Sequence, residues 1–188
     1  SNTEKAKDAD IVSIIVTSTL NKSVIDALPN LKLITTRTTG FNHIDCEYAK
    51  TKGIQVSSVP AYGSRTVAEF AFALILTLSR KVREATSAMK KSGDFSIPAN
   101  AQGFDLDGKT LGVIGTGKIG KNVVQIARGF NMNVIACDSC PDLEFATKNN
   151  ISYKTFEEVL AQSDIVTLHA PYTKENHHLI NKNNIYLF

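Results

Sequence analysis

The most informative segment of this 188-residue chain is GTGKIG, residues 115–120. It follows the short apolar run LGVI at 111–114 and opens a helical pattern that continues to residue 130. A glycine-rich turn between a buried strand and a helix is the phosphate-binding element of a Rossmann unit when an acidic residue follows about 20 residues later. This context predicts a dinucleotide-binding β-α-β unit.

Each position of the glycine stretch has an expected role. Gly115 permits the tight turn, Gly117 lets a pyrophosphate approach the backbone, and Gly120 lets the helix pack closely on the strand. The N–H groups of Lys118 and Ile119 lie at the positive end of the helix, where we expect them to bind the anion. The alternative is a glycine turn that binds no ligand.

Asp138 is the acidic residue that the motif requires. It follows the apolar strand pattern at 133–137, about 20 residues after the glycine stretch. A carboxylate at this position accepts hydrogen bonds from ribose hydroxyls and repels the 2′-phosphate of NADP. The next residue is Ser139 rather than an arginine. We therefore expect NAD rather than NADP as the cofactor.

Short apolar runs alternate with helical patterns along the whole chain, which indicates an α/β fold with parallel sheets. We expect strands over 11–16, 31–35, 54–59, 111–114, 133–137 and 164–168. We expect helices over 23–28, 44–52, 66–91, 118–130, 143–148 and 156–162, of which 66–91 is one long helix with an apolar stripe. After residue 111, only the first β-α-β half of a dinucleotide fold can be counted.

The composition is that of an ordinary globular protein, with 43% hydrophobic and 21% charged residues. The net charge of +3 is small and evenly spread, which argues against nucleic-acid binding. The longest apolar run, 70–78, is shorter than the roughly 20 residues of a membrane span. Three cysteines are too few for a disulfide framework and indicate a reducing cytoplasm. Cys137 and Cys140 form a C-x-x-C pair without a second pair of zinc ligands, and we expect no metal site.

Five motifs link the chain to a known family. They are TTGFNHID at 38–45, VPAY at 59–62, TVAE at 66–69, LDGKTLGVIG at 106–115 and HAPYT at 169–173. In these motifs the chain resembles the D-isomer-specific 2-hydroxyacid dehydrogenases, and most closely their NAD-dependent D-lactate dehydrogenase branch. The resemblance covers nearly the whole chain.

The resemblance implies two domains. It implies a Rossmann-type doubly wound parallel sheet, incomplete, together with part of a flavodoxin-like α/β substrate domain. Residues 1–64 correspond to the partial substrate-binding domain and residues 65–188 to the NAD-binding domain, whose second half is expected to be missing. Residues 65–105 correspond to a long helix and dimerisation arm, which implies a homodimer.

The resemblance also implies substrate contacts in the first domain. Thr39 and Gly40 match the turn at which the family holds the substrate carboxylate on backbone N–H groups. Tyr62 matches an active-site tyrosine of the D-lactate branch, although the residue by itself is equally compatible with a turn tyrosine packed on the domain cleft. Phe41 and Tyr62 favour a substrate with a small apolar side chain.

Further positions match cofactor contacts of the family. Lys118, Ile119 and Asp138 are among them, in agreement with the motif. The others follow the last expected strand: His169, Ala170, Pro171 and Asn176, the last of these at a position where many relatives carry threonine.

The family transfers a hydride between NAD(H) and a small D-2-hydroxy acid or 2-keto acid, which makes D-lactate and pyruvate the expected pair. The catalytic arginine, glutamate and histidine of relatives come after the position of Phe188, so no catalytic residue is expected in this chain. We expect an internal fragment of a dehydrogenase that is inactive alone. The alternative is an NAD(H)-responsive regulatory binding protein of the corepressor type.

Overall fold

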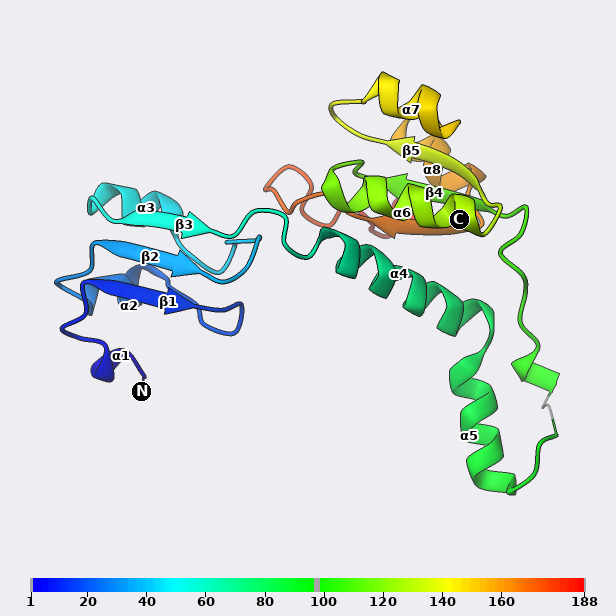
Figure 1. Ribbon diagram of the computed structural model, residues 1–188, viewed down its shortest axis with the longest axis horizontal. Helices are drawn as coiled ribbons and strands as arrows, with labels where there is room; N and C mark the ends of the chain where they lie inside the picture. The colour runs from blue at the N-terminus through cyan, green and yellow to red at the C-terminus, as the bar shows by residue number, and fades with distance from the viewer. Residues whose placement is uncertain (1, 97–98, 188) are drawn as a thin grey trace. The chain divides into compact units, whose positions relative to one another are not determined.

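The computed structural model describes residues 2–96 and 99–187, and the chain divides into two compact units. The first unit covers residues 1–63 and the second covers residues 64–188. Each unit has its own sheet, and every strand pair in both sheets is parallel (Figure 1). The expected α/β fold with parallel sheets is confirmed. Within the described ranges, no helix has the length and apolar character needed to cross a membrane.

The first unit is a three-stranded sheet in the order β1-β2-β3 with short helices between the strands. Its elements are α1 (Asn2–Lys5), β1 (Ile11–Ile14), α2 (Lys22–Asp26), β2 (Leu33–Thr36), α3 (Cys46–Thr51) and β3 (Gln55–Ser58). Ile25 of α2, Ile34 of β2 and Ala49 of α3 are buried in one apolar cluster. Thr36 is paired with Ser58, so the carboxyl ends of β2 and β3 lie side by side.

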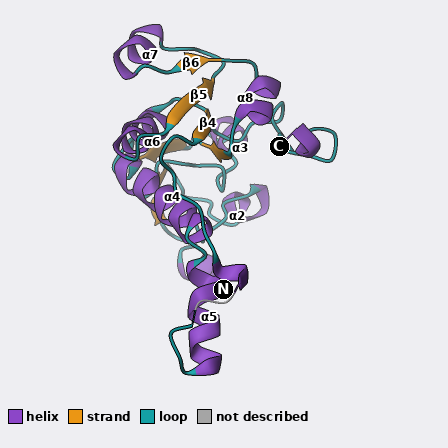
Figure 2. Ribbon diagram, turned by 90° about the vertical axis from the view of Figure 1, so that its right-hand side faces the viewer, coloured by secondary structure: helices purple, strands orange, loops and turns teal. Residues whose placement is uncertain are grey.

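The second unit is a four-stranded sheet in the order β6-β5-β4-β7. Its strands are β4 (Thr110–Ile114), β5 (Asn133–Cys137), β6 (Ser152–Tyr153) and β7 (Ile165–Leu168). Its helices are α4 (Ser64–Ser79), α5 (Val82–Ser92), α6 (Lys118–Gly129), α7 (Leu143–Asn149) and α8 (Phe156–Gln162), with short 3₁₀ turns at Ala99–Ala101 and Ile185–Leu187. Figure 2 shows helices on both faces of this sheet.

Alternation along β4 explains why both faces of the second sheet are covered. Leu111 and Val113 point into a core formed with α4 and α6, whereas Ile114 packs with Val159 and Leu160 of α8 on the other face. On the first face, α4 packs against α6, and the rings of Phe72 and Phe130 stack with centroids 5.4 Å apart. A strand buried on both faces reads as a continuous apolar run, as β4 does.

The strand order places a topological switch point between β4 and β7. The chain runs outward from β4 through β5 to β6, and then returns by α8 to add β7 on the opposite side of β4. The expectation of a single β-α-β half is wrong in two respects. Strand β6 was not predicted, because it has only two residues, and β7 begins the second half of the fold rather than completing the first.

The prediction of one long helix over residues 66–91 is also wrong. Helix α4 ends at Ser79 and α5 begins at Val82, with Lys81 between them in the left-handed conformation at φ 53°. The cause is the returning chain, since the N–H of Phe104 donates to the carbonyl of Ser79 at 2.8 Å. In a continuous helix that carbonyl would accept from the residue four positions later. The apolar pattern of the sequence runs across this break.

Candidate functional site

The carboxyl ends of β4, β5 and β7 meet at one edge of the second sheet. Two backbone hydrogen bonds align these strand ends. The N–H of Gly115 donates to the carbonyl of Cys137 at 2.8 Å, and the N–H of His169 donates to the carbonyl of Ile114 at 2.7 Å. The edge contains a mainly apolar cleft of about 530 Å³. This volume lies within the usual range for small-molecule sites. Ligands of open α/β sheets bind at this kind of switch point.

Seven of the predicted cofactor residues line this cleft although they are far apart in the sequence. They are Gly115, Gly117, Asp138, His169, Ala170, Pro171 and Asn176. Besides the predicted Ala170 and Pro171, the apolar part of the lining comes from residues that were not predicted, namely Ile114, Cys137, Phe156 and Leu179. An apolar cleft beside a glycine loop and a carboxylate has the character of a site for an adenine ring with its ribose and phosphates.

The glycine loop leaves room for a phosphate group at one position. Gly115 has a φ of +91°, and a Cβ there would lie 2.6 Å from the backbone nitrogen of Ala170. Glycine at 115 therefore serves the turn and also the close approach of the segment after β7. A Cβ at Gly120 would lie 2.0 Å from the carbonyl oxygen of Gly115. By contrast, a Cβ at Gly117 would meet no atom within 4 Å, so the space in front of Gly117 is open.

The amino end of α6 faces the open space at Gly117. Gly117 is the N-cap residue, and within the described part of the chain no side chain accepts a hydrogen bond from the first turn at this cap. The uncapped N–H groups and the helix dipole favour an anion here. The Lys118 side chain is exposed, whereas the Ile119 side chain packs against the core. Because the Ile119 side chain packs partly against the core, we expect its contact with a ligand to come from the backbone N–H.

Asp138 is held by three donors from the protein itself. Its Oδ2 accepts the backbone N–H of Thr116 at 2.6 Å and the hydroxyl of the same residue at 3.0 Å. Its Oδ1 accepts the N–H of Cys140 at 2.8 Å. Burial alone raises the pKa of Asp138, but the hydrogen bonds from Cys140 and Thr116 and the charge of Lys121 lower it below the ordinary value. The carboxylate is fixed and ionised.

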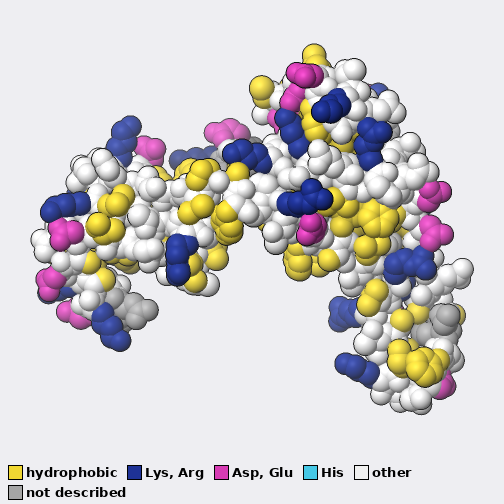
Figure 3. Space-filling model, viewed as in Figure 1, with side chains coloured by type: hydrophobic (Ala, Val, Ile, Leu, Met, Phe, Trp, Pro, Cys, Tyr) yellow, Lys and Arg dark blue, Asp and Glu magenta, His cyan; other side chains and the backbone are white. Residues whose placement is uncertain are grey.

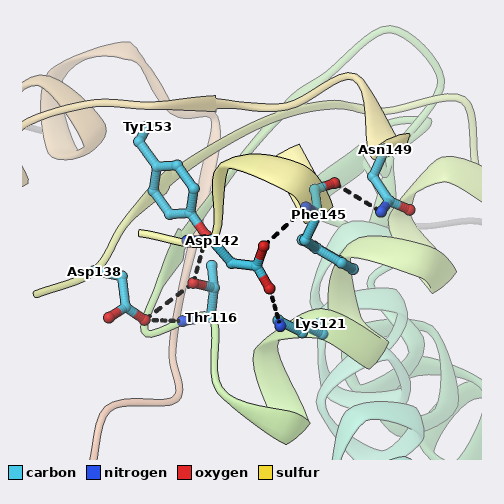
Figure 4. Close-up of polar contacts among 7 residues, drawn as sticks. All are labelled: Thr116, Lys121, Asp138, Asp142, Phe145, Asn149 and Tyr153. Carbon is cyan, nitrogen blue, oxygen red and sulfur yellow. Dashed lines mark hydrogen bonds and ion pairs between the residues drawn. The ribbon is translucent and has the colours of Figure 1, made fainter. Parts of the chain in front are cut away.

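A wider network surrounds this carboxylate (Figure 4). The hydroxyl of Thr116 lies 2.7 Å from that of Tyr153, which accepts the N–H of Asp142 at 3.2 Å. Asp142 also forms an ion pair with Lys121. Sequence reasoning missed Thr116, Tyr153, Asp142 and Lys121. Only Thr116 carried a sequence signal, because it is the variable second residue of the glycine motif.

The segment after β7 is ordered by its own side chains. Asn176 accepts the N–H of Thr173 and donates to the carbonyl of Pro171, both at 2.7 Å. The His169 ring lies 2.8 Å from the hydroxyl of Thr167, and burial lowers its pKa, which keeps the ring neutral. Through these two hydrogen bonds, Asn176 holds residues 171–176 in the conformation that forms one wall of the cleft.

In the first unit, the predicted substrate turn follows β2. The Thr39 hydroxyl donates to the carbonyl of Val59 at 3.0 Å, which ties the turn to the segment after β3. A Cβ at Gly40 would meet no atom within 4 Å, so the turn has open space beside it. Tyr62 is 66% exposed and lies in the turn that ends this unit. Contacts of Thr39, Gly40 and Tyr62 with a substrate stay predictions.

A chain of hydroxyl groups orients the Gly40 peptide. The Thr38 hydroxyl donates to the carbonyl of Gly40 at 2.7 Å, so its oxygen accepts from Thr36 at 2.6 Å. Thr36 is buried, and its oxygen in turn accepts from Nε2 of His43 at 3.2 Å. These directions follow because a hydroxyl has one proton to donate. Nε2 of His43 is therefore the donor at the start of this chain of hydrogen bonds.

Comparison with known proteins identifies the family. Residues 72–188 match the sequence profile described as "D-isomer specific 2-hydroxyacid dehydrogenase, NAD binding domain". This chain belongs to that family.

Individual members of the family match over nearly the whole chain. A 2-hydroxyacid dehydrogenase homolog of Zymomonas mobilis is 41% identical over 95% of this chain and 54% of its own length. The glyoxylate reductase of Korarchaeum cryptofilum is 34% identical over 94% of this chain and 54% of its own length. The chain thus spans about half the length of these dehydrogenases.

A solved structure of the family supports both the fold and the cofactor. The D-lactate dehydrogenase of Aquifex aeolicus, complexed with NAD and lactic acid, superposes with a TM-score of 0.89. It is 39% identical, and the match covers 98% of this chain and 55% of that one. The Rossmann-type NAD-binding domain and NAD as the cofactor, both expected from the glycine motif and Asp138, are confirmed for this family member.

Proposed function

We propose that this protein transfers a hydride between NAD(H) and a small D-2-hydroxy acid or 2-keto acid, with D-lactate and pyruvate as the pair. The observation that carries the proposal is the cleft at the switch point, which combines an open, uncapped helix terminus with a fixed carboxylate. Its residues fit NAD: the backbone after Gly117 holds the pyrophosphate, Asp138 holds the adenosine ribose, and the apolar lining receives the adenine.

The bound cofactor supplies hydride chemistry, and the first unit supplies recognition of the acid. Backbone N–H groups at Thr39 and Gly40 receive the substrate carboxylate, in the open space beside Gly40. The series of hydrogen bonds from His43 through Thr36 and Thr38 fixes the Gly40 carbonyl, and so fixes the orientation of that peptide. Tyr62 and Phe41 are exposed apolar rings that suit a methyl substituent rather than a charged one.

The substrate is tested by comparing 2-keto acids that differ only at C3. The full-length enzyme should reduce pyruvate with NADH at a higher kcat/KM than glyoxylate or hydroxypyruvate, and NADPH should replace NADH poorly. The 188-residue chain alone should bind NAD without reducing pyruvate, because the catalytic arginine, glutamate and histidine of the family match none of its residues. Preference for hydroxypyruvate would contradict the substrate assignment and leave the cofactor assignment intact.

We also propose a homodimer that forms through α4. Val67, Phe70, Leu74 and Leu78 recur at helical spacing and are 45%, 64%, 51% and 72% exposed. Hydrophobic side chains are visible along α4 in Figure 3. A contiguous apolar stripe on an exposed helix face marks a protein–protein contact. Sedimentation velocity of the full-length protein should give twice the monomer mass.

A cytoplasmic location completes the proposal. All three cysteines, Cys46, Cys137 and Cys140, are free thiols. Thiols that stay unpaired suit a reducing compartment. Detection of the protein in a cytosolic fraction by immunoblotting checks this location, and its recovery from an oxidising compartment would contradict it.

A further inference from the structure

The hydrogen bonds around Asp138 form a chain with a single possible direction. A carboxylate only accepts, so the Thr116 hydroxyl must donate its one proton to Oδ2 of Asp138. The Thr116 oxygen must then accept the proton of the Tyr153 hydroxyl at 2.7 Å. The Tyr153 oxygen is left to accept the N–H of Asp142 at 3.2 Å. Every donor in the chain points toward the carboxylate, an arrangement that strengthens each bond.

The backbone fixes the two ends of this chain. Tyr153 lies on β6, paired with Ala136 of β5, and β5 leads directly into Asp138. Asp142 caps α7 by accepting the N–H of Phe145 at 2.9 Å, which orients its own N–H. The hydroxyl of Tyr153 is therefore held between two elements that both adjoin the cleft.

A second interaction keeps a competing cation away from Asp138. The positive charge of Lys121 helps to lower the pKa of Asp138, after the larger effects of burial and of the hydrogen bonds from Cys140 and Thr116. Lys121 itself forms an ion pair with Asp142 and lies over the Phe145 ring, 5.1 Å from its centroid. Lys121 is thus engaged on the far side of the network. Oδ2 of Asp138 has two partners and Oδ1 has one, so one acceptor position of the carboxylate stays available at Oδ1.

We propose that Thr116 and Tyr153 are positioning residues that hold the Asp138 carboxylate in the orientation that accepts the 2′-hydroxyl of the adenosine ribose. This inference rests on the proposed role of Asp138. Neither residue contacts the cofactor through the hydroxyl considered, because both hydroxyls are used within the network. Their removal should weaken recognition of the 2′-hydroxyl specifically, rather than binding in general.

The test compares two ligands that differ by one hydroxyl group. The affinities of ADP and 2′-deoxy-ADP for the 188-residue chain are measured by isothermal titration calorimetry. A hydrogen bond to a charged acceptor is worth about tenfold in affinity, so the wild-type chain should prefer ADP by about tenfold. Tyr153→Phe should reduce the preference to about threefold. Thr116→Val should nearly abolish it, because it removes the hydroxyl donor to Oδ2 and the link to Tyr153, and leaves only the Thr116 N–H on that oxygen.

Two variants serve as controls. Thr116→Ser keeps the hydroxyl and should retain the wild-type preference. Tyr48→Phe makes the same chemical change as Tyr153→Phe in the first unit, where the Tyr48 hydroxyl donates to Asp26, and it should leave the preference unchanged. Circular dichroism establishes that each variant is folded, and the conservative Tyr153→Phe change keeps the partly buried ring packed against the core.

The outcomes separate this inference from the proposed function. A parallel fall in affinity for both ligands, with the preference unchanged in Tyr153→Phe and Thr116→Val, would show that the network is only structural and would overturn the inference. A wild-type chain that binds both ligands equally would contradict the ribose role of Asp138 itself. A preference that falls in both variants and returns in Thr116→Ser would support the inference.

Discussion

The sharpest structural prediction contrasts two glycines of the same loop, Gly115 and Gly117. Gly115→Ala places a methyl group 2.6 Å from the nitrogen of Ala170 and 2.7 Å from the carbonyl carbon of His169, at a φ of +91°. Backbone strain of this kind costs about 1–3 kcal/mol, and overpacking adds about 1–3 kcal/mol. Both contacts are with backbone atoms, so relief requires β4 and β7 to move apart. The free energy of unfolding of the second unit should therefore fall by about 2–6 kcal/mol.

Gly117→Ala is the matched control, because it adds the same methyl group two residues away. Gly117 has a φ of −66°, and no atom lies within 4 Å of the added Cβ. Alanine at an N-cap is slightly worse than glycine, so the stability loss should stay below about 1 kcal/mol. The methyl group instead occupies the space proposed for the pyrophosphate. NAD affinity should fall at least tenfold while the fold persists.

Thermal unfolding followed by circular dichroism, together with calorimetric titration of NAD, distinguishes the two variants. For a unit of this size, about 4 °C is lost per kcal/mol, so Gly115→Ala should lower Tm by at least about 8 °C. Gly117→Ala should stay within about 4 °C of the wild type. Unfolding of Gly115→Ala at the wild-type temperature would contradict this difference between the two glycines, as would an equal loss of stability in Gly117→Ala and Gly115→Ala.

Four further predictions address the cofactor, the pH dependence, the dimer and the substrate turn. Asp138→Asn should lower NAD affinity by about tenfold and NADP affinity less, measured by calorimetry; an equal loss for both would contradict the proposed role of the carboxylate. Burial lowers the pKa of His169 in the folded state below the ordinary histidine value of 6.5. The contribution of His169 to the free energy of unfolding is therefore full above pH 6.5 and declines as the pH falls below 6.5. Urea denaturation should show this decline, and His169→Asn should reduce it. Leu74→Glu should convert the full-length dimer to a monomer in sedimentation velocity, whereas Thr66→Glu, at an exposed polar position of the same helix, should not. Thr38→Val removes the donor to the Gly40 carbonyl and should raise KM for pyruvate about threefold to tenfold in steady-state kinetics, with a smaller change in kcat.

The sequence predicted the elements that carry strong periodicity. The strand over 133–137 and the helix over 156–162 have the expected bounds, because an apolar β-branched run and a capped amphipathic turn depend on local residues. Thr155 and Glu158 form a capping box at the start of that helix. The glycine motif and Asp138 were also readable, since their function requires particular residue types at a set spacing.

The elements that escaped prediction depend on distant partners. The break between α4 and α5 arises because Phe104 takes the carbonyl of Ser79, and residues 80–91 carry no local sign of that contact. Strand β6 has two residues and exists through its pairing with β5. The secondary-structure propensity of a segment does not predict contacts between residues that are far apart in sequence.

The network around Asp138 escaped prediction for the same reason. Tyr153 lies 37 positions beyond Thr116, and its role depends on the direction in which a two-residue strand presents its side chain. Asp142 and Lys121 read as ordinary surface charges in the sequence. The sequence thus predicted the residue proposed to bind the ribose, but not those that orient it.

We propose that NAD binds at the carboxyl edge of the second sheet, with Asp138 on the adenosine ribose. The most direct test is a titration of the isotopically labelled chain with NAD, followed by the backbone amide signals of Gly115, Gly117, Asp138 and Ala170. These four signals should shift together and saturate with one bound NAD, while the signals of β1 to β3 stay in place. Unchanged signals at these four amides under saturating NAD would contradict it.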